Sequence, residues 1–121
     1  MSTAVKKATG RIRVQVTADV NIAAPVARRL VNTELMQKVG QMVMAGEAEL
    51  LVDGQKVYWK VPLLVVPPDG DANVYPTGRC ALVNAYSGIY VLNKKEVEAL
   101  KSAARPLLYR LYPDLPEGWI W

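Results

Sequence analysis

Histidine is absent from this chain of 121 residues, and cysteine occurs once, as Cys80. Histidine is the commonest general base and the commonest transition-metal ligand, so its absence removes Ser-His and Cys-His nucleophile pairs and most metal centres. One thiol cannot form an internal disulfide or a zinc site of the usual Cys/His kind. The sequence therefore predicts a protein that is not an enzyme and that needs no metal and no cofactor.

Acid–base chemistry without histidine would have to use carboxylates, tyrosine or lysine. The candidates are Asp19, Glu34, Glu47, Glu49, Tyr58 and Lys60. Their positions follow no spacing that catalysis requires, and a solvated surface is the ordinary place for such side chains. An enzyme or small-ligand binder with an acid in a cavity is therefore kept as a secondary alternative.

Long hydrophobic runs are also missing. No apolar run approaches the roughly 18 residues of a membrane span, and the lysines near the N-terminus are not followed by the apolar stretch of a signal peptide. We expect a soluble, cytoplasmic protein that contacts no membrane. With 51% hydrophobic and 21% charged residues, the chain has the composition of a globular protein. Residues 1–9 are expected to be a flexible tail, and residues 10–121 a single α+β domain.

The chain carries a net charge of +4, and cations outnumber anions among residues 1–40. A mild basic field of this kind is compatible with nucleic-acid binding. The candidate residues for such binding are Arg11, Arg13, Arg28 and Arg29. No recognisable binding motif accompanies these arginines, so a basic surface that keeps the protein soluble is favoured, and nucleic-acid binding is kept as an alternative.

Periodicity predicts a strand and then a helix in the first part of the chain. From residue 11 to residue 20, apolar and polar residues alternate strictly, as in a half-buried strand. Pro25 then suits a first helical position, and apolar residues recur at helical spacing as far as Met42. With Gly46 as the stop signal, we expect a helix over residues 24–45. Gly40 falls inside that helix, at a cost in stability relative to alanine.

Asp53-Gly54 is typical of the two-residue type I′ turn that joins the strands of a hairpin. Strands joined in this way place their apolar residues on one common face. The predicted cross-strand pairs are Val52 with Gln55, Leu50 with Val57, and Ala48 with Trp59.

The second strand of this hairpin has two apolar faces. Alternate residues from Val57 to Val65 form the first face, and the second face carries Pro62, Leu64 and Val66. The helix could pack on either face. Residues 67–78 are polar and are expected to form a surface loop.

The next strand is expected to turn Cys80, Leu82 and Asn84 toward the core. A cysteine in such a position is usually a small, inert hydrophobic residue. The strand should end at Ser87-Gly88, because these residues favour a turn.

Asn93, with Glu96 three residues later, predicts a capping box and a second helix. Its apolar stripe keeps its phase across Pro106, so a kinked or restarted helix is favoured over two unrelated segments. Trp119 and Trp121 should dock on the domain or on a partner, because such large apolar side chains are costly to leave in water. The expected fold is α+β, with an antiparallel sheet of about four strands packed on one long helix in the order β-α-β-β-β-α.

A helix followed by three antiparallel strands, of which the last reads Leu82-Val83-Asn84-Ala85-Tyr86-Ser87-Gly88, resembles the PepSY-type domain of bacteria. In that family the final strand typically ends in a V-D-A-x-T-G pattern, and this chain differs from it at Asn84 and Ser87. The similarity covers residues 25–91. The resemblance implies a cystatin-like fold and a non-catalytic domain of the kind proposed to regulate peptidases.

Apolar residues that the predicted core does not use point to protein binding, since a monomer of this size rarely exposes a large apolar patch. These interface candidates are Pro62, Leu64, Val66, Leu30, Met44, Trp119 and Trp121. We therefore expect a small protein-interaction or regulatory module. Its partner is a second copy in a homodimer or a heterologous protein.

Overall fold

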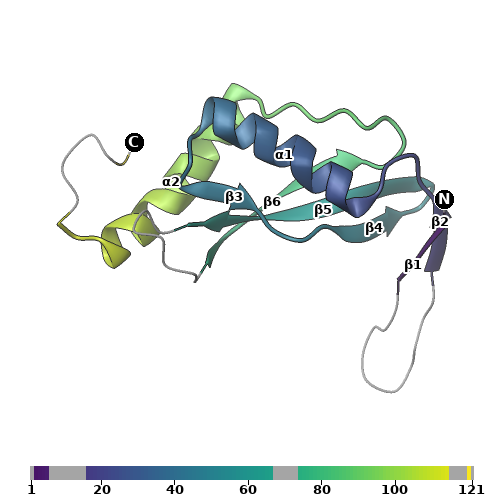
Figure 1. Ribbon diagram of the computed structural model, residues 1–121, viewed down its shortest axis with the longest axis horizontal. Coiled ribbons are helices and arrows are strands. Elements are labelled where there is room, and N and C mark those ends of the chain that lie inside the picture. The colour runs from purple at the N-terminus through teal and green to yellow at the C-terminus, as the bar shows by residue number, and fades with distance from the viewer. Residues whose placement is uncertain (1, 6–15, 67–73, 115–119, 121) are drawn as a thin grey trace, which may run out of the picture.

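The computed structural model describes residues 2–5, 16–66, 74–114 and 120. Its elements, in chain order, are β1 (Ser2–Val5), β2 (Val16–Asp19), α1 (Ala24–Lys38), β3 (Val43–Ala45), β4 (Glu49–Asp53), β5 (Lys56–Val65), β6 (Tyr75–Asn84) and α2 (Lys94–Leu111). The fold is α+β with an antiparallel four-stranded sheet, which confirms the predicted class (Figure 1). The strands β1 and β3 are additions to the predicted order.

Strand β5 is the centre of the four-stranded sheet. β6 pairs with one side of β5, and the shorter β3 and β4 share its other side. Pro62 lies in β5 opposite the link between these two short strands, where its carbonyl accepts the N–H of Gly46 at 2.8 Å. Because the N–H and C=O of one strand residue point to the same side, the missing N–H of Pro62 also faces this link. A proline is therefore tolerated inside a central strand.

The two helices of the described chain pack on one face of this sheet. From β5 the buried residues are Val57, Trp59, Val61, Leu63 and Val65, and from the helices they are Ala27, Val31, Leu35, Val97, Leu100, Ala104 and Leu108. These side chains belong to one hydrophobic cluster. The helices therefore pack on the face of β5 that carries alternate residues from Val57 to Val65. The sequence did not decide between this face and the face of Pro62, Leu64 and Val66.

The helix α1 ends at Lys38, so the predicted helix over residues 24–45 was too long. Gly40 lies outside it, with a φ of +125° that a glycine adopts without strain, and its N–H donates to the Leu35 carbonyl. This turn lets Val43–Ala45 pair with β5 as β3. Met42 matches the helical spacing, but the hydrogen bonds of the sheet outweigh that weak local preference.

The hairpin between β4 and β5 has the predicted place but another register. Asp53 pairs with Lys56, so the loop is Gly54-Gln55 and not Asp53-Gly54. Gly54 supplies a φ of +62° at the first loop position, where the predicted turn required a left-handed conformation of Asp53. The observed pairs are Val52 with Val57 and Leu50 with Trp59. Because the shift is two residues, every side chain keeps its predicted face.

The faces of β6 are the reverse of those predicted. Ala81 and Val83 are buried, together with Ala85 directly after the strand, whereas Cys80, Leu82 and Asn84 are exposed. A shift of one residue inverts a strand completely, and the small alanines suit the side on which the helices lie. The expectation that Cys80 faces the core is therefore wrong.

The strand β1 pairs with β2 in a separate two-stranded sheet, so residues 2–5 form a strand where a flexible tail was predicted. The predicted strand over residues 11–20 is observed as β2, and its earlier part lies outside the described residues. Residues 67–73 of the predicted loop also lie outside the described residues. The last part of that prediction is wrong, because β6 already begins at Tyr75.

The helix α2 continues through Pro106 as one element, so the sequence was right to exclude two unrelated segments, and the helix does not restart. The N-cap is confirmed, since Asn93 Oδ1 accepts the N–H of Glu96 at 2.8 Å. The second half of the predicted capping box differs, because Glu96 Oε1 accepts from the side-chain amide of Asn93 and not from its main-chain N–H. No helix of the described chain is long and apolar enough to cross a membrane. Trp119 and Trp121 lie outside the described residues, while Ile120 between them is only 5% exposed and belongs to the core.

Candidate interaction surfaces

The open sheet face is the side of the four-stranded sheet that lies away from α1 and α2. Its apolar members are Met44, Leu51, Tyr58, Pro62, Leu64, Cys80 and Leu82, and its central charged members are Glu49 and Lys60. Alternation along the strands fixes this set, because every second residue points away from the core. Leu51 is 38% and Leu82 48% exposed, values typical of side chains that no other element covers.

Cross-strand pairing arranges the open sheet face in rows. Leu51, Tyr58 and Asn84 form one row, and Met44, Leu64 and Pro76 form another at the far end. Between them lies the row of Glu49, Lys60 and Leu82. Glu49 and Lys60 stand directly opposite one another. The single ion pair within the described part of the chain is that of Glu34 and Lys38, so these two charges have no ionic partner there.

The structure brings some of the predicted interface residues together and separates others. Met44, Pro62 and Leu64 all lie on the open sheet face and are half-buried. Val66 follows β5, where its N–H donates to the Met42 carbonyl at 2.9 Å. Leu30, also an interface candidate, lies on α1 and packs against the core, so it does not belong to the open sheet face.

Leu51 and Leu82 were not among the candidates. Leu82 was missed because the phase of β6 had been inverted. The position of Leu51 on the open sheet face could have been predicted from the sequence. Leu51 alternates with Leu50 and Val52, whose side chains point toward the core face.

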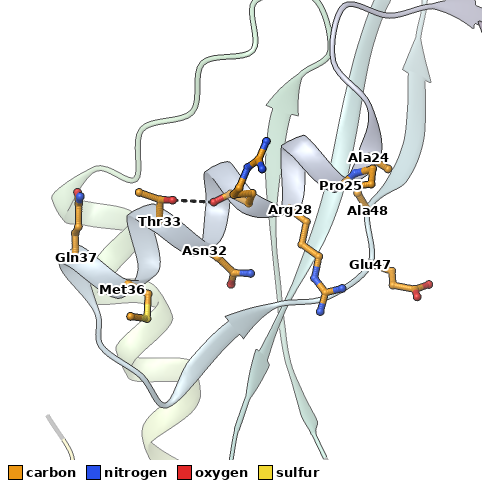
Figure 2. A pocket seen from close by; sticks show the side chains of 10 residues that line it. Ala24, Pro25, Arg28, Asn32, Thr33, Met36, Gln37, Glu47 and Ala48 are labelled. Carbon is orange, nitrogen blue, oxygen red and sulfur yellow. Dashed lines mark hydrogen bonds between the residues drawn. The ribbon is translucent and has the colours of Figure 1, made fainter. Parts of the chain in front are cut away.

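A second surface feature is the α1 groove, a cavity of about 710 Å³ along one side of α1. Its lining comes from the helix and from the link between β3 and β4, namely Ala24, Pro25, Arg28, Arg29, Asn32, Thr33, Met36, Gln37, Glu47 and Ala48. Figure 2 shows Arg28 and Asn32 projecting from α1 toward β3 and the link. Of the nucleic-acid candidates, Arg28 and Arg29 both line this groove, whereas Arg11 and Arg13 lie outside the described residues.

Arg28 and Asn32 hold the outer edge of β3. Arg28 Nε donates to the Ala45 carbonyl at 3.1 Å, and Asn32 Oδ1 accepts the Ala45 N–H at 2.8 Å. Both main-chain groups of Ala45 point away from β5, since Met44 and Gly46 supply the groups that face it. The two side chains thus satisfy the main-chain groups of a strand edge that could otherwise pair with another chain.

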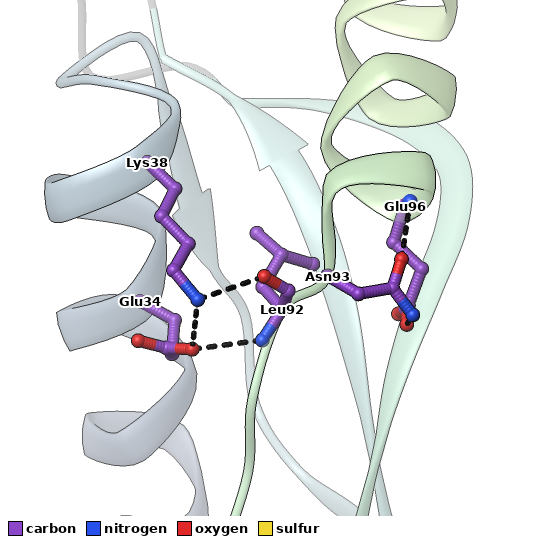
Figure 3. A network of polar contacts seen from close by, with 5 residues as sticks. All are labelled: Glu34, Lys38, Leu92, Asn93 and Glu96. Carbon is purple, nitrogen blue, oxygen red and sulfur yellow. Dashed lines mark hydrogen bonds and ion pairs between the residues drawn. The ribbon is translucent and has the colours of Figure 1, made fainter.

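Glu34 and Lys38 are also side chains of α1 that form hydrogen bonds with main-chain groups, here in the segment before α2. Glu34 Oε1 accepts the Leu92 N–H at 2.8 Å, and Lys38 Nζ donates to the Leu92 carbonyl and to Glu34 Oε1, each at 2.9 Å (Figure 3). The hydrogen bond from Lys38, together with that from the Leu92 N–H, lowers the pKa of Glu34. The Glu34 carboxylate therefore has a structural role.

The hydroxyl of Tyr90 is fully buried and has no hydrogen-bond partner within the described part of the chain. Among the described residues it is the one buried side-chain polar atom of this kind. Burial, followed by the charges of Glu96 and Glu34, raises the pKa of Tyr90 to about 12. This hydroxyl therefore stays protonated at neutral pH. It does not line the α1 groove.

The acid–base candidates do not form one enclosed site. Tyr58, Glu49 and Lys60 share the open sheet face, where they are not enclosed in a cavity. Asp19 ends β2, Glu34 holds Leu92, and Glu47 is the single carboxylate among the residues that line the α1 groove. Among the described residues, no group of three His, Cys, Asp or Glu side chains could hold a metal ion. Comparison of the chain with family models, curated proteins and solved structures finds no match.

Proposed function

We propose that this protein is a small, non-enzymatic interaction module that forms a homodimer through its open sheet face. The observation that carries the proposal is the apolar character of a sheet face on which neither described helix packs. Antiparallel sheets often leave one face to solvent, but that face is then mainly polar. Here Leu51, Tyr58, Leu64 and Leu82 occupy it, in rows on either side of Glu49 and Lys60, and a gathering of exposed apolar residues on one face is typical of a binding site.

A second copy suits this face because its charges are self-complementary. In a twofold dimer the same patch meets itself, so residue i of one protomer contacts residue j of the other and the reverse. Glu49 and Lys60 lie side by side on adjacent strands without an ion pair. A twofold axis near this pair would set Glu49 of each protomer against Lys60 of the other, with apolar rows on either side. A heterologous partner would not carry the same pair of charges at the matching positions.

The regulatory part of the proposal rests on the sequence resemblance to PepSY-type domains over residues 25–91, which would make the module a non-catalytic regulator. A cytoplasmic location belongs to the same proposal. There the exposed thiol of Cys80, which lies on the open sheet face, would remain reduced.

The test is light scattering coupled to size exclusion, at low and high salt and over a wide range of protein concentration. We expect a dimer that persists in high salt, because most of the interface is apolar. Leu82→Glu should give a monomer, since it would bury a charge within the proposed interface. The matched control is Val91→Glu, which alters an apolar side chain of similar exposure in the segment before α2. A wild-type protein that stays monomeric throughout would contradict the proposal.

A further inference from the structure

The α1 groove has the dimensions of a site for a chain segment. It follows α1 from Ala24 to Gln37, which corresponds to roughly 20 Å at about 1.5 Å per helical residue. Its volume of about 710 Å³ lies within the range of ligand sites, which is about 300–1,000 Å³. A long, open groove of this size accommodates several residues of an extended peptide more readily than a compact small molecule. The open sheet face lies on the other side of the sheet.

The charge of the groove favours an anionic ligand. Arg28 uses its Nε to bond the Ala45 carbonyl, which leaves its two terminal nitrogens available, and Arg29 is exposed beside it. Neither guanidinium has an ion pair within the described part of the chain, and the single carboxylate in the lining, Glu47, has none either. Two arginines against one glutamate give a net positive lining. Arginine is the side chain best suited to bind a carboxylate through two parallel hydrogen bonds.

The remainder of the groove offers what the main chain and side chains of a peptide require. The amides of Asn32 and Gln37 supply hydrogen-bonding groups, and Asn32 still has its NH₂ donors because only its Oδ1 is used on Ala45. Met36, 61% exposed, is a flexible apolar contact at the other end of the groove from the arginines. None of the lining residues is aromatic, so the groove lacks the stacking surface that single-stranded nucleic acids use.

From these features we infer that the α1 groove binds an extended acidic segment of another protein. Carboxylates of the segment pair with Arg29 and with the free end of Arg28, and an apolar side chain further along contacts Met36. This site is separate from the proposed dimer interface, so each can exist without the other.

The test uses fluorescence anisotropy with a labelled short peptide of alternating valine and glutamate. Arg29→Glu should weaken binding of this probe at least about tenfold, since it replaces a charge-assisted hydrogen bond by repulsion. Met36→Glu should weaken it as well. Lys95→Glu is the control: it makes the same change of charge at an exposed site on α2, away from the groove, and should leave the affinity unchanged. Circular dichroism verifies that each variant is folded.

Two further probes complete the design, a peptide of alternating valine and lysine and a single-stranded thymidine oligonucleotide. We expect neither to bind at a concentration that saturates the acidic peptide. Failure of the acidic peptide to bind, or equal weakening by Lys95→Glu and Arg29→Glu, would overturn the inference. So would an oligonucleotide that binds more tightly than the peptide and is released by Arg29→Glu. The measurements are repeated on Leu82→Glu, whose groove is intact, so that loss of the dimer is not mistaken for loss of the site.

Discussion

The Glu34 carboxylate accepts the main-chain N–H of Leu92 at 2.8 Å, and so joins α1 to the residue directly before the N-cap of α2. Lys38 completes the contact by donating to the Leu92 carbonyl. Leu92 is itself 2% exposed, so its main chain has little access to water. Two side chains on successive turns of one helix thus satisfy both polar groups of a buried residue 58 positions away from Glu34.

Acid should weaken this contact. The pKa of Glu34 is lowered from 4.5 by the hydrogen bond from Lys38 and then by that from the Leu92 N–H. A group whose pKa is lower in the folded state stabilises the fold above its unfolded pKa, and this stability is lost as the pH falls through the folded pKa. In urea unfolding, the midpoint of the wild type should therefore fall more steeply below pH 4.5 than that of Glu34→Gln. Parallel pH profiles for the two proteins would show that Glu34 makes no such contribution.

At neutral pH, Glu34→Ala should be more damaging than Glu34→Gln. The amide of glutamine can still accept the Leu92 N–H, whereas alanine leaves this buried donor unpaired at a cost of about 1–3 kcal/mol. The free energy of unfolding from urea titration distinguishes the two variants. Equal losses would mean that the charge of Glu34, and not its hydrogen bond to Leu92, is what stabilises the fold.

The Tyr90 hydroxyl predicts a pH effect at the alkaline end. Its pKa is raised from 10.0 to about 12, chiefly by burial, so the folded state disfavours the tyrosinate. The stability that this group contributes is complete below pH 10 and is lost as the pH rises toward 12. Absorbance titration should show one tyrosine in the wild type that ionises near pH 12 and is missing in Tyr90→Phe. Because the hydroxyl has no hydrogen-bond partner among the described residues, Tyr90→Phe should not lower stability at pH 7.

The edge of β3 should depend on Asn32. Asn32→Ala leaves the outward N–H of Ala45 without its acceptor and should cost about 1–2 kcal/mol of unfolding free energy. Hydrogen exchange at the Ala45 amide should accelerate in the same variant, since this donor becomes free at the strand edge. Asn32→Asp keeps an oxygen acceptor at this position and is the matched control. An Ala45 amide that exchanges equally fast in wild type and Asn32→Ala would contradict the contact.

Gly46 should not tolerate a side chain. A Cβ at this position would lie 2.9 Å from Cγ of Pro62 and 3.1 Å from Cδ1 of Leu64, closer than atoms pack without displacement. We expect Gly46→Ala to cost about 1–3 kcal/mol, the range found for overpacking. In a Pro62→Ala background the same substitution should cost clearly less, because the obstructing ring is gone. Additive effects of the two changes in urea unfolding would show that the ring is not the obstacle.

Local patterns were sufficient where neighbouring residues alone decide the structure. The N-cap contact of Asn93 with Glu96 and the helix behind it depend on hydrogen bonds within a few residues, so the start of α2 was predicted correctly. The alternation from Val57 to Val65 also holds, because a long strand with one buried face permits a single assignment of its sides. These features, and the α+β class that follows from them, were determined by the sequence itself.

The tertiary structure decided those features for which the local sequence pattern fitted two different structures about equally well. Alternation in β6 allowed either Leu82 or Val83 to face the core, and only the close approach of the helices selects the side with Ala81 and Ala85. Met42 fits a longer α1, but pairing of β3 with β5 buries Val43 and Ala45 in the core, a gain that the local spacing does not show. The α1 groove and the contacts of Asn32 and Glu34 join segments distant in the chain, and their partners are main-chain groups that carry no sequence signal. For that reason the interaction surfaces emerged from the fold, while its class could be predicted beforehand.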